Sequence, residues 1–308
     1  MNLKKPKFWD YKKPNILAYF LYPISLLIKI INYTKSKQAK KKFKIKTICV
    51  GNIYLGGTGK TSLCIKINKI LQRNKIKSCF IKKFYTNQID EIKLLEKNGK
   101  IFSSSKRIDA LKQAENENYE VAILDDGLQD KSIKYDLKFV CFNNINWVGN
   151  GMTIPAGPLR EEIKELKNYD HIFLNGNLED TEKLKKQILE INSHTTIHLG
   201  KYKPLNINEF DKNENYYVFS GIGNYQTLIS MLKNNGIKII KDKEFPDHHK
   251  YRDEDINKII NEAENLNCKI ITTEKDSSKL KETYLNKIKI IKSELNIVDE
   301  EQFIKTIL

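Results

Sequence analysis

Residues 48–62 place a glycine-rich loop and a Lys-Thr pair directly after an apolar segment. Glycines let backbone N–H groups converge on phosphate oxygens, and the N-terminus of a following helix adds positive partial charge. In such a loop Lys60 would reach the β- and γ-phosphates, and the Thr61 hydroxyl would hold Mg²⁺. The segment therefore predicts a nucleoside triphosphate site; the alternative is a glycine-rich turn that binds nothing. The residues expected to contact the nucleotide are Gly56, Gly57, Thr58, Gly59, Lys60 and Thr61.

The loop departs from the strict P-loop spacing, G-x-x-x-x-G-K-[ST], at one position. Counting back from Lys60 places the first glycine at position 54, where this chain carries Tyr54. The part of the motif from Gly56 to Thr61 is intact.

A second motif follows a later apolar run, Val121–Leu124, which ends in Asp125 and Asp126. A carboxylate at such a strand end helps to hold Mg²⁺ beside nucleotide phosphates. Adjacent strand residues point to opposite faces, so both aspartates can serve one site only if the strand ends there, as Gly127 suggests. An acidic turn without a metal is the alternative.

A long glycine- and proline-rich loop contains Gly149-Asn-Gly151 and Ile154-Pro-Ala-Gly-Pro-Leu-Arg-Glu161. This composition alone usually marks a turn. Arg160 would neutralise phosphate charge and Glu161 would contact a metal if the loop reaches the nucleotide.

Two further polar segments follow apolar runs near the C-terminus. Phe245-Pro-Asp-His-His249 places His248 and His249 after a proline and an aspartate. A metal-binding or catalytic role for these histidines competes with a surface loop in which they are solvated. Thr272-Thr-Glu-Lys-Asp276 is compatible with a charged turn.

Strand-length apolar runs alternate with helix-compatible stretches, which predicts right-handed βαβ units and a largely parallel sheet with helices on both faces. Ligands of such sheets bind at the carboxyl ends of the strands, where each of these motifs would lie. The expected strands are 47–50, 78–81, 121–124, 139–142 and 171–174, and the expected helices include 63–72 and 108–117.

A polar stretch from about 178 to 215, with weak strand signals around 195–199, precedes a second α/β pattern. That pattern has expected strands at 216–220, 237–240 and 269–272, a turn at 221–224 and a helix at 225–234. We therefore expect an N-terminal helical segment (1–45), a P-loop domain (46–205) and a smaller α/β domain (206–308).

The N-terminal segment is apolar and aromatic between lysine-rich flanks. The run 16–31 would be about 24 Å long as a helix, shorter than the ~30 Å hydrocarbon core, and Pro23 and Lys29 interrupt it. Apolar side chains beside many lysines are typical of a helix that lies in a membrane interface. An amphipathic helix packed on the domain is the alternative.

Composition indicates a globular chain of one large or two ordinary domains, with 308 residues, 40% hydrophobic residues and 30% charged residues. The formal net charge of +16 favours anionic partners such as nucleic acid, anionic lipid or phosphorylated substrates, although a solvated lysine-rich surface would look the same. The five cysteines form no C-x-x-C pair, so a reducing cytosol is expected and a disulfide framework or zinc site is not.

Together these segments resemble the lipid A 4′-kinase family, tetraacyldisaccharide 4′-kinase. The matching motifs occur in the family's order over about residues 8–276, and the family's P-loop also lacks the first glycine. They are Val50-Gly-Asn52, Gly56-Gly-Thr-Gly-Lys-Thr61, Asp125-Asp-Gly-Leu-Gln129, Gly149-Asn-Gly151, Pro155-Ala-Gly-Pro-Leu-Arg-Glu161, Phe219-Ser-Gly-Ile-Gly-Asn224, Phe245-Pro-Asp-His-His249 and Thr272-Thr-Glu-Lys-Asp276.

The resemblance implies a peripheral kinase on the cytoplasmic face of the bacterial inner membrane. It would use ATP and Mg²⁺ to phosphorylate the 4′-hydroxyl of a tetraacylated glucosamine disaccharide 1-phosphate, giving lipid IVA in lipid A and lipopolysaccharide biosynthesis. A P-loop α/β domain, a smaller α/β domain and an N-terminal helix on an anionic membrane are implied. We expect a monomer without a nucleic acid partner.

Residue roles carry over from the family where its motifs match. Lys60 and Arg160 would act on the phosphates, and the base would be Asp90, assisted by His248 or His249. The metal site would draw on Thr61, Asp125, Asp126, Gln129 and Glu161.

Three places depart from the family pattern. Asp90 and Glu91 lack the Gly and Pro that flank them in Gly-Asp-Glu-Pro, and Lys82-Lys-Phe-Tyr-Thr86 stands where the family usually has Ser-Arg-Gly-Tyr-Gly. Asp130 replaces a usual histidine. Two other functions therefore stay open: a nucleic-acid-stimulated P-loop ATPase, motivated by the charge, and a catalytically degenerate member of the family.

Overall fold

The computed structural model describes residues 5–35, 40–85, 89–176, 179, 181–247 and 249–308. The chain forms two compact units, Met1–Gly200 with Ile297–Leu308 and Lys201–Asn296. The division falls within two strands, β7 (Thr196–Pro204) and β12 (Ser293–Ile297).

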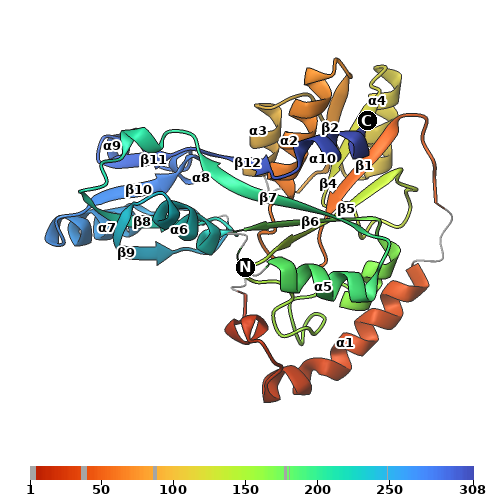
Figure 1. Cartoon of the computed structure of the whole chain (residues 1–308), viewed down its shortest axis with the longest axis horizontal. Coiled ribbons are helices and arrows are strands. Elements are labelled where there is room, and N and C mark those ends of the chain that lie inside the picture. Colours follow the sequence, from red (N-terminus) through yellow and green to blue (C-terminus); the bar gives the residue numbers. More distant parts are fainter. Residues whose placement is uncertain (1–4, 36–39, 86–88, 177–178, 180, 248) are drawn as a thin grey trace. The chain divides into compact units, whose positions relative to one another are not determined.

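The elements of the larger unit alternate between strands and helices (Figure 1). In chain order they are η1 (Lys7–Asp10), α1 (Ile16–Lys35), β1 (Lys46–Gly51), α2 (Lys60–Arg73), β2 (Ser78–Lys83), α3 (Ile89–Glu96), β3 (Ile101–Ser104), α4 (Arg107–Asn116), β4 (Val121–Asp125), β5 (Leu137–Asn143), η2 (Ile163–Asn168), β6 (His171–Gly176), α5 (Thr181–Ile191) and, after the smaller unit, α10 (Glu300–Ile307).

The larger sheet has the strand order β12-β7-β6-β5-β1-β4-β2-β3. Strand β1 pairs in parallel with β4 and β5, and β4 pairs in parallel with β2. The register sets Asp125 beside Val50 on one side and beside Lys82 on the other. The carboxyl ends of β1, β4 and β2 therefore meet at one edge of the sheet. Because β4 and β5 lie on opposite sides of β1, the strand order reverses at this place, where sheets of this kind bind their ligands.

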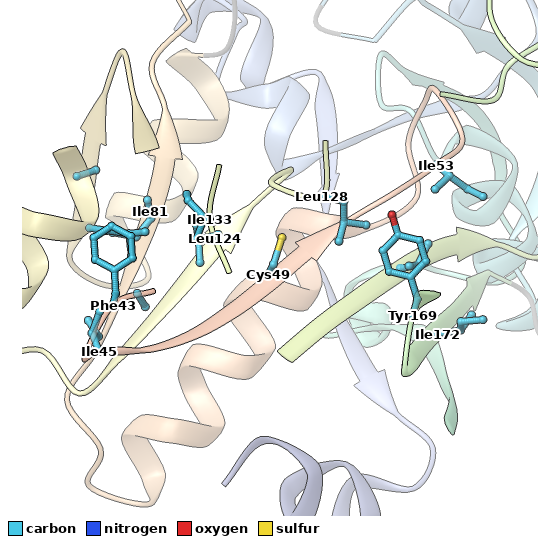
Figure 2. Packing of buried hydrophobic residues seen from close by; sticks show 14 of the residues in the cluster. Phe43, Ile45, Cys49, Ile53, Ile81, Leu124, Leu128, Ile133, Tyr169 and Ile172 are labelled. Carbon is cyan, nitrogen blue, oxygen red and sulfur yellow. The ribbon is translucent and has the colours of Figure 1, made fainter. Parts of the chain in front are cut away.

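Both faces of this sheet are covered. Residues of α4 and α5 share one apolar cluster with alternate strand residues such as Cys49, Leu124 and Val140 (Figure 2). On the other face α10 places Phe303 against Phe139, with ring centroids 5.4 Å apart. Burial on both faces explains why the central strands are continuous apolar runs without polar alternation.

The smaller unit is a second parallel sheet with the order β11-β10-β8-β9. Tyr217 and Phe219 of its strand β8 pack with Ile256 and Ile259 of α7, while Val218 packs with Leu228 of α6. Its elements are η3 (Ile207–Glu209), β8 (Asn215–Ser220), α6 (Tyr225–Asn234), β9 (Lys238–Glu244), α7 (Asp253–Asn265), β10 (Lys269–Thr273), α8 (Glu274–Ser277), α9 (Glu282–Leu285) and β11 (Ile288–Ile291).

The P-loop NTPase-like α/β class predicted from the sequence is confirmed, and the strands predicted in both parts are present with small changes at their ends. The polar stretch 178–215 also contains a helix, α5, that its many charged residues concealed. The predicted smaller domain ran to residue 308, whereas residues 297–308 cluster with the larger unit, because Phe303 and Ile307 are buried there.

Helix α1 is a single helix of 20 residues that contains Pro23. None of the helices in the described ranges has the length and apolar character that a bilayer-spanning segment requires. One side of α1 contacts the larger unit through Ala18 and Ser25, while Ile16 and Phe20 are 89% and 77% exposed.

Two histidines lie in the aromatic packing around α10. The rings of His171 and His198 are 5.6 Å apart, and His198 also lies 5.0 Å from the Phe303 ring. Burial lowers the pKa of His198 to about 4, with a further contribution from His171, and burial also lowers the pKa of His171. Each histidine is therefore accommodated in its neutral form.

We predict that this cluster makes stability fall as the pH is lowered. A histidine whose pKa is lower in the folded state binds a proton more readily when the chain is unfolded, so stability is lost as the pH falls from about 6.5 towards 4. Between pH 7 and pH 4 the free energy of unfolding of the wild type should therefore fall by on the order of 2 kcal/mol more than that of His198→Phe. Urea unfolding at each pH measures it. The exposed His194→Phe is the matched control, and equal slopes for all three proteins would contradict the prediction.

Candidate functional site

The predicted phosphate cradle forms the connection between β1 and α2. Strand β1 ends at Gly51, and α2 begins at Lys60 after a loop of eight residues. Gly59, which caps α2, has φ 77°, a left-handed conformation that side chains with a Cβ rarely adopt. This conformation turns the chain sharply into the helix and leaves the first N–H groups of α2 available to an anion.

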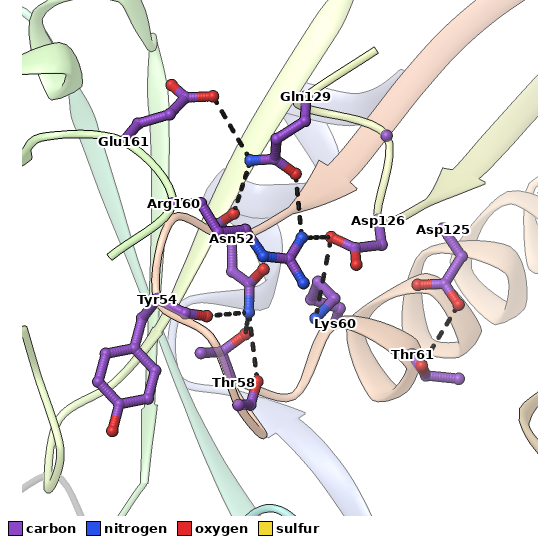
Figure 3. A network of polar contacts seen from close by, with 12 residues as sticks. Asn52, Tyr54, Thr58, Lys60, Thr61, Asp125, Asp126, Gln129, Arg160 and Glu161 are labelled. Carbon is purple, nitrogen blue, oxygen red and sulfur yellow. Dashed lines mark hydrogen bonds and ion pairs between the residues drawn. The ribbon is translucent and has the colours of Figure 1, made fainter. Parts of the chain in front are cut away.

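Asn52 holds the loop in its curved shape from inside (Figure 3). Its side-chain amide donates to the carbonyl oxygen of Tyr54 at 2.6 Å, to that of Gly56 at 3.2 Å and to the Thr58 hydroxyl at 3.0 Å. The residue is completely buried. Asn52 belongs to the matching motif Val50-Gly-Asn52, but its spacing from the other loop residues gave no sign of this role.

Two more amides attach the loop to the end of β6 and to the turn after β4. Asn175, at the end of β6, donates to the carbonyl oxygen of Thr58 at 2.6 Å, and Gln129 donates to that of Asn52 at 3.0 Å. The P-loop is thus held by hydrogen bonds from both sides of β1.

Tyr54 connects the loop to the N-terminal segment. Its side chain is 1% exposed, its hydroxyl donates to Asp10 at 2.7 Å, and the Lys5 ammonium donates to the same hydroxyl. Its backbone also forms an antiparallel bridge with Leu159. The residue that replaces the first P-loop glycine therefore anchors the start of the loop by burying a ring.

The loop 149–162 packs between the N-terminal segment and the P-loop. Gly149 has φ 58°, and a Cβ added there would lie 2.1 Å from the carbonyl oxygen of Trp9. Ser25 of α1 donates to the carbonyl oxygen of Thr153 at 2.9 Å. At the other end of the loop, the backbone N–H of Arg160 donates to the carbonyl oxygen of Ile53 at 2.6 Å.

Arg160, Lys60 and Asp126 converge at the mouth of the P-loop (Figure 3). The Arg160 guanidinium lies 2.7 Å from the Asp126 carboxylate, and the Lys60 ammonium lies 4.0 Å from the same oxygen. Burial alone would raise the pKa of Asp126, but Lys60 and Arg160 outweigh it and lower the pKa. Two cations and one ionised carboxylate thus face the position expected for nucleotide phosphates.

Strand β4 ends at Asp125, and Asp126 has φ 50°. The two adjacent carboxylates therefore diverge: Asp126 faces Arg160, while Asp125 accepts a hydrogen bond from Thr61 at 3.4 Å. The sequence-based condition for both aspartates to serve one site, that the strand ends between them, is met.

Gln129 and Glu161 are engaged with protein groups near the same site. Gln129 accepts a hydrogen bond from Arg160 at 3.0 Å, and its amide nitrogen lies 3.5 Å from Glu161. Glu161 also accepts from the Tyr169 hydroxyl at 2.9 Å and lies 3.5 Å from Lys131. The metal-ligand roles predicted for Gln129 and Glu161 stay predictions.

The Thr61 hydroxyl and the Asp125 carboxylate fit a magnesium site of the P-loop type. Mg²⁺ prefers oxygen ligands and is usually held by one or two carboxylates together with substrate phosphates. Throughout the described part of the chain no group of three or more His, Cys, Asp or Glu residues is placed to hold a metal ion by itself.

Lys82 is a charged residue of the site that stands out in the sequence only as a departure from the family pattern. Its ammonium lies 2.6 Å from Asp125 and 2.6 Å from Glu91. Burial would lower the pKa of Lys82, but the two carboxylates outweigh it and raise the pKa. In the sequence, Lys82 directly follows the apolar run of this strand, and that position is the signal that could have indicated the contact.

The structure places the predicted base and its partner in different units. Asp90 lies half-buried in the first turn of α3, and His249 belongs to the smaller unit, where its Nε2 lies 3.1 Å from Asp255. His248 lies outside the described residues. The assistance predicted from His248 or His249 to Asp90 stays a prediction.

The segment Thr272–Asp276 anchors the loop after β8. The buried Asp276 accepts hydrogen bonds from the Ser220 hydroxyl, the Gly221 N–H and the Thr273 hydroxyl. The charged turn expected from the sequence thus holds two carboxyl ends of the smaller sheet together.

Comparisons with known proteins agree on one family. A family model described as tetraacyldisaccharide-1-P 4′-kinase matches residues 17–97 and 89–308. A tetraacyldisaccharide 4′-kinase from Pelagibacter ubique is 58% identical over 301 residues, covering 98% of this chain and 96% of the relative. One from Rickettsia akari is 33% identical over 318 residues, covering 96% and 94%.

A solved structure is similar over the whole chain. LpxK from Aquifex aeolicus, determined in complex with ATP, has a TM-score of 0.67 and 25% identity, covering 95% of this chain and 98% of that chain.

We predict that Asn52→Ala weakens ATP binding about tenfold (~1.4 kcal/mol), because the loop carbonyls and Thr58 lose the amide that holds them in place. Equilibrium titration with a fluorescent ATP analogue measures the effect. Asn74→Ala is the matched control, because its amide donates to the carbonyl oxygen of Ile70 at the far end of α2. Equal ATP affinities of the wild type and both variants would argue against the role of Asn52.

Proposed function

The chain belongs to the tetraacyldisaccharide-1-P 4′-kinase family, and on that premise we propose that it transfers the γ-phosphoryl group of ATP to the 4′-hydroxyl of a tetraacylated glucosamine disaccharide 1-phosphate. The observation that carries the proposal is the convergence of Lys60, Arg160 and Asp126 at a P-loop in a chain that matches this family almost from end to end.

On the phosphate side, the chain provides fixed positive charge where the transferred group gains negative charge. Phosphoryl transfer depends mainly on positioning and on electrostatic stabilisation of the oxygens around phosphorus. Lys60 and the N–H groups at the start of α2 would bind the β- and γ-phosphates. Arg160 would exchange its contact with Asp126, in part, for a contact with phosphate.

When bound, Mg²⁺ would offset the negative charge of the phosphates, and Thr61 and Asp125 are the residues that would hold it. Asp126 lies beside them, on the side of Lys60 and Arg160.

On the acceptor side, Asp90 would take the proton of the sugar hydroxyl as its oxygen bonds to the γ-phosphorus and the bond to the departing ADP breaks. A histidine of the Asp-His-His motif, His248 or His249, would orient this carboxylate. Both roles rest on the family motif.

We infer that helix α1 binds the surface of the cytoplasmic membrane, where an acylated substrate resides. Its exposed side carries Ile16, Tyr19, Phe20, Leu27 and Ile30, which recur at helical spacing. Exposed lysines lie on both flanks, including Lys12, Lys13, Lys40 and Lys42. An apolar helix face between basic segments suits an interface with anionic lipid.

We predict that the purified protein transfers ³²P from γ-labelled ATP to the tetraacylated disaccharide 1-phosphate, and that RNA and DNA do not stimulate its ATP turnover. In single-turnover reactions Asp90→Asn should reduce transfer at least about 100-fold, because the hydroxyl keeps its proton. A loss of less than about tenfold would argue against Asp90 as the base. Stimulation by nucleic acid without lipid labelling would favour the ATPase alternative, and no transfer at all would favour a degenerate family member.

We predict that Phe20→Ser combined with Leu27→Ser lowers binding to anionic vesicles at least about tenfold (~1.4 kcal/mol), because two exposed apolar side chains no longer enter the interface. Co-sedimentation with phosphatidylglycerol vesicles measures the partition coefficient. Leu189→Ser on α5, where the leucine is also exposed (43%), is the control. A double variant that sediments like the wild type would contradict the inference.

A further inference from the structure

We propose that Lys82 is a positioning residue, whose ammonium group clamps the first turn of α3 to the carboxyl end of β4 and thereby holds the Asp90 segment beside the phosphate site. The inference rests on the proposed kinase function, because the acceptor side is the part of the site that Lys82 would shape. Neither the family motifs nor the proposed mechanism assigns a role to this residue.

The clamp joins three elements at one nitrogen atom. Lys82 lies near the end of β2, where the register pairs it with Asp125 of β4. Its side chain is 4% exposed, and its ammonium lies 2.6 Å from both the Asp125 and the Glu91 carboxylates. Glu91 belongs to α3, so an interaction inside the sheet extends directly to that helix.

Electrostatics explains why a cation is needed at this position. Asp125 is 1% exposed, and a buried ionised carboxylate is costly unless a charged partner accompanies it. One oxygen of Asp125 and one of Glu91 contact the same nitrogen, so these two oxygens lie within roughly 5 Å of each other. At that distance two negative charges repel strongly in a poorly solvated site. The Lys82 ammonium contacts both carboxylates and attracts each of them, which offsets this repulsion.

The clamp determines the position of Asp90 because α3 is a short helix. The helix has eight residues, and helices of this length depend on tertiary contacts for their stability. Its apolar contacts come from Ile92 and Leu95, which lie later in the helix. Glu91 is the neighbour of Asp90 in the first turn, so fixing Glu91 also fixes the direction in which Asp90 leaves the helix.

Lys82 occupies the first position of the segment that departs from the family pattern. That pattern begins with a neutral serine, whose side chain is too short to join two carboxylates. The clamp is therefore a feature of this chain and of relatives that carry lysine at the same place.

Hydrogen exchange of α3 tests the clamp independently of any substrate. Glu91→Gln removes one charge and leaves the buried Lys82–Asp125 pair intact, so this variant should fold. We expect exchange of the α3 amides to become at least about fivefold faster in Glu91→Gln, because the first turn is released. The exposed Glu96→Gln on the same helix makes an identical chemical change and should exchange like the wild type. Unchanged exchange in Glu91→Gln would overturn the proposal.

Kinetics tests whether the clamp positions the site. Single-turnover transfer at saturating acceptor should fall at least about tenfold in Glu91→Gln, while its dissociation constant for ATP stays within about twofold of the wild-type value. A purely structural ion pair would leave transfer unchanged or would weaken ATP binding in proportion, and either result would overturn the positioning role. Lys82→Met should lose more transfer than Glu91→Gln, provided that its circular dichroism spectrum matches that of the wild type.

The two measurements separate the clamp from the kinase function. If the wild type does not label the disaccharide, the kinase proposal fails, and the positioning role fails with it because it requires transfer. If the wild type does label it but Glu91→Gln exchanges and transfers like the wild type, only the inference about Lys82 fails.

Discussion

The site depends on compensating two adjacent negative charges at the end of one buried strand. Asp125 and Asp126 leave β4 in different directions, and each is met by cations from other elements. Lys82 reaches Asp125 from β2, while Lys60 and Arg160 reach Asp126 from α2 and from the loop after Gly149. Because unpaired buried charge is costly, these ion pairs tie the sheet, the P-loop and the long loop into one charged network.

The same network explains why the N-terminal segment matters to a site at the sheet edge. Tyr54 of the P-loop is hydrogen-bonded to Asp10, and Ser25 of α1 is hydrogen-bonded to the loop that carries Arg160. The N-terminal segment, which includes the helix that would lie on lipid, is therefore in direct contact with both loops that would hold phosphate. Within the larger unit, the proposed membrane attachment and the proposed phosphate binding would therefore share their supporting contacts.

Much of the fold was predictable because its signals are local. The apolar runs of the parallel strands and the glycine-rich loop before Lys60 depend on neighbouring residues in the sequence, and the structure places those elements where they were expected. Helix α5 was not predicted because its charged residues outweigh its apolar ones in sequence, although Ile188 is buried. The return of α10 to the larger unit depends on a contact with Phe139, more than 160 residues away, which no local pattern encodes.

The site was predictable where motifs carry chemistry and not where residues support them. Lys60, Asp126 and Arg160 were selected from the sequence and lie together. Asn52 and Lys82 were not assigned roles, because a buried amide and a buried ammonium acquire meaning only from the groups that surround them in three dimensions. Tyr54 belongs to both classes: its departure from the P-loop pattern was visible, but its contact with Asp10 was not.

The return of α10 to the larger unit has a consequence for biosynthesis. The smaller unit is inserted between Gly200 and Ile297, so the ribosome completes it before it releases the residues that cover Phe139 and Phe173. During that interval the part of the larger sheet around Phe139 and Phe173 lacks the cover that α10 provides, even though all the strands from β1 to β6 have been synthesised. The nascent chain therefore exposes an aromatic surface for as long as it takes to translate about a hundred residues, several seconds at typical elongation rates, and a chaperone has that time in which to bind it.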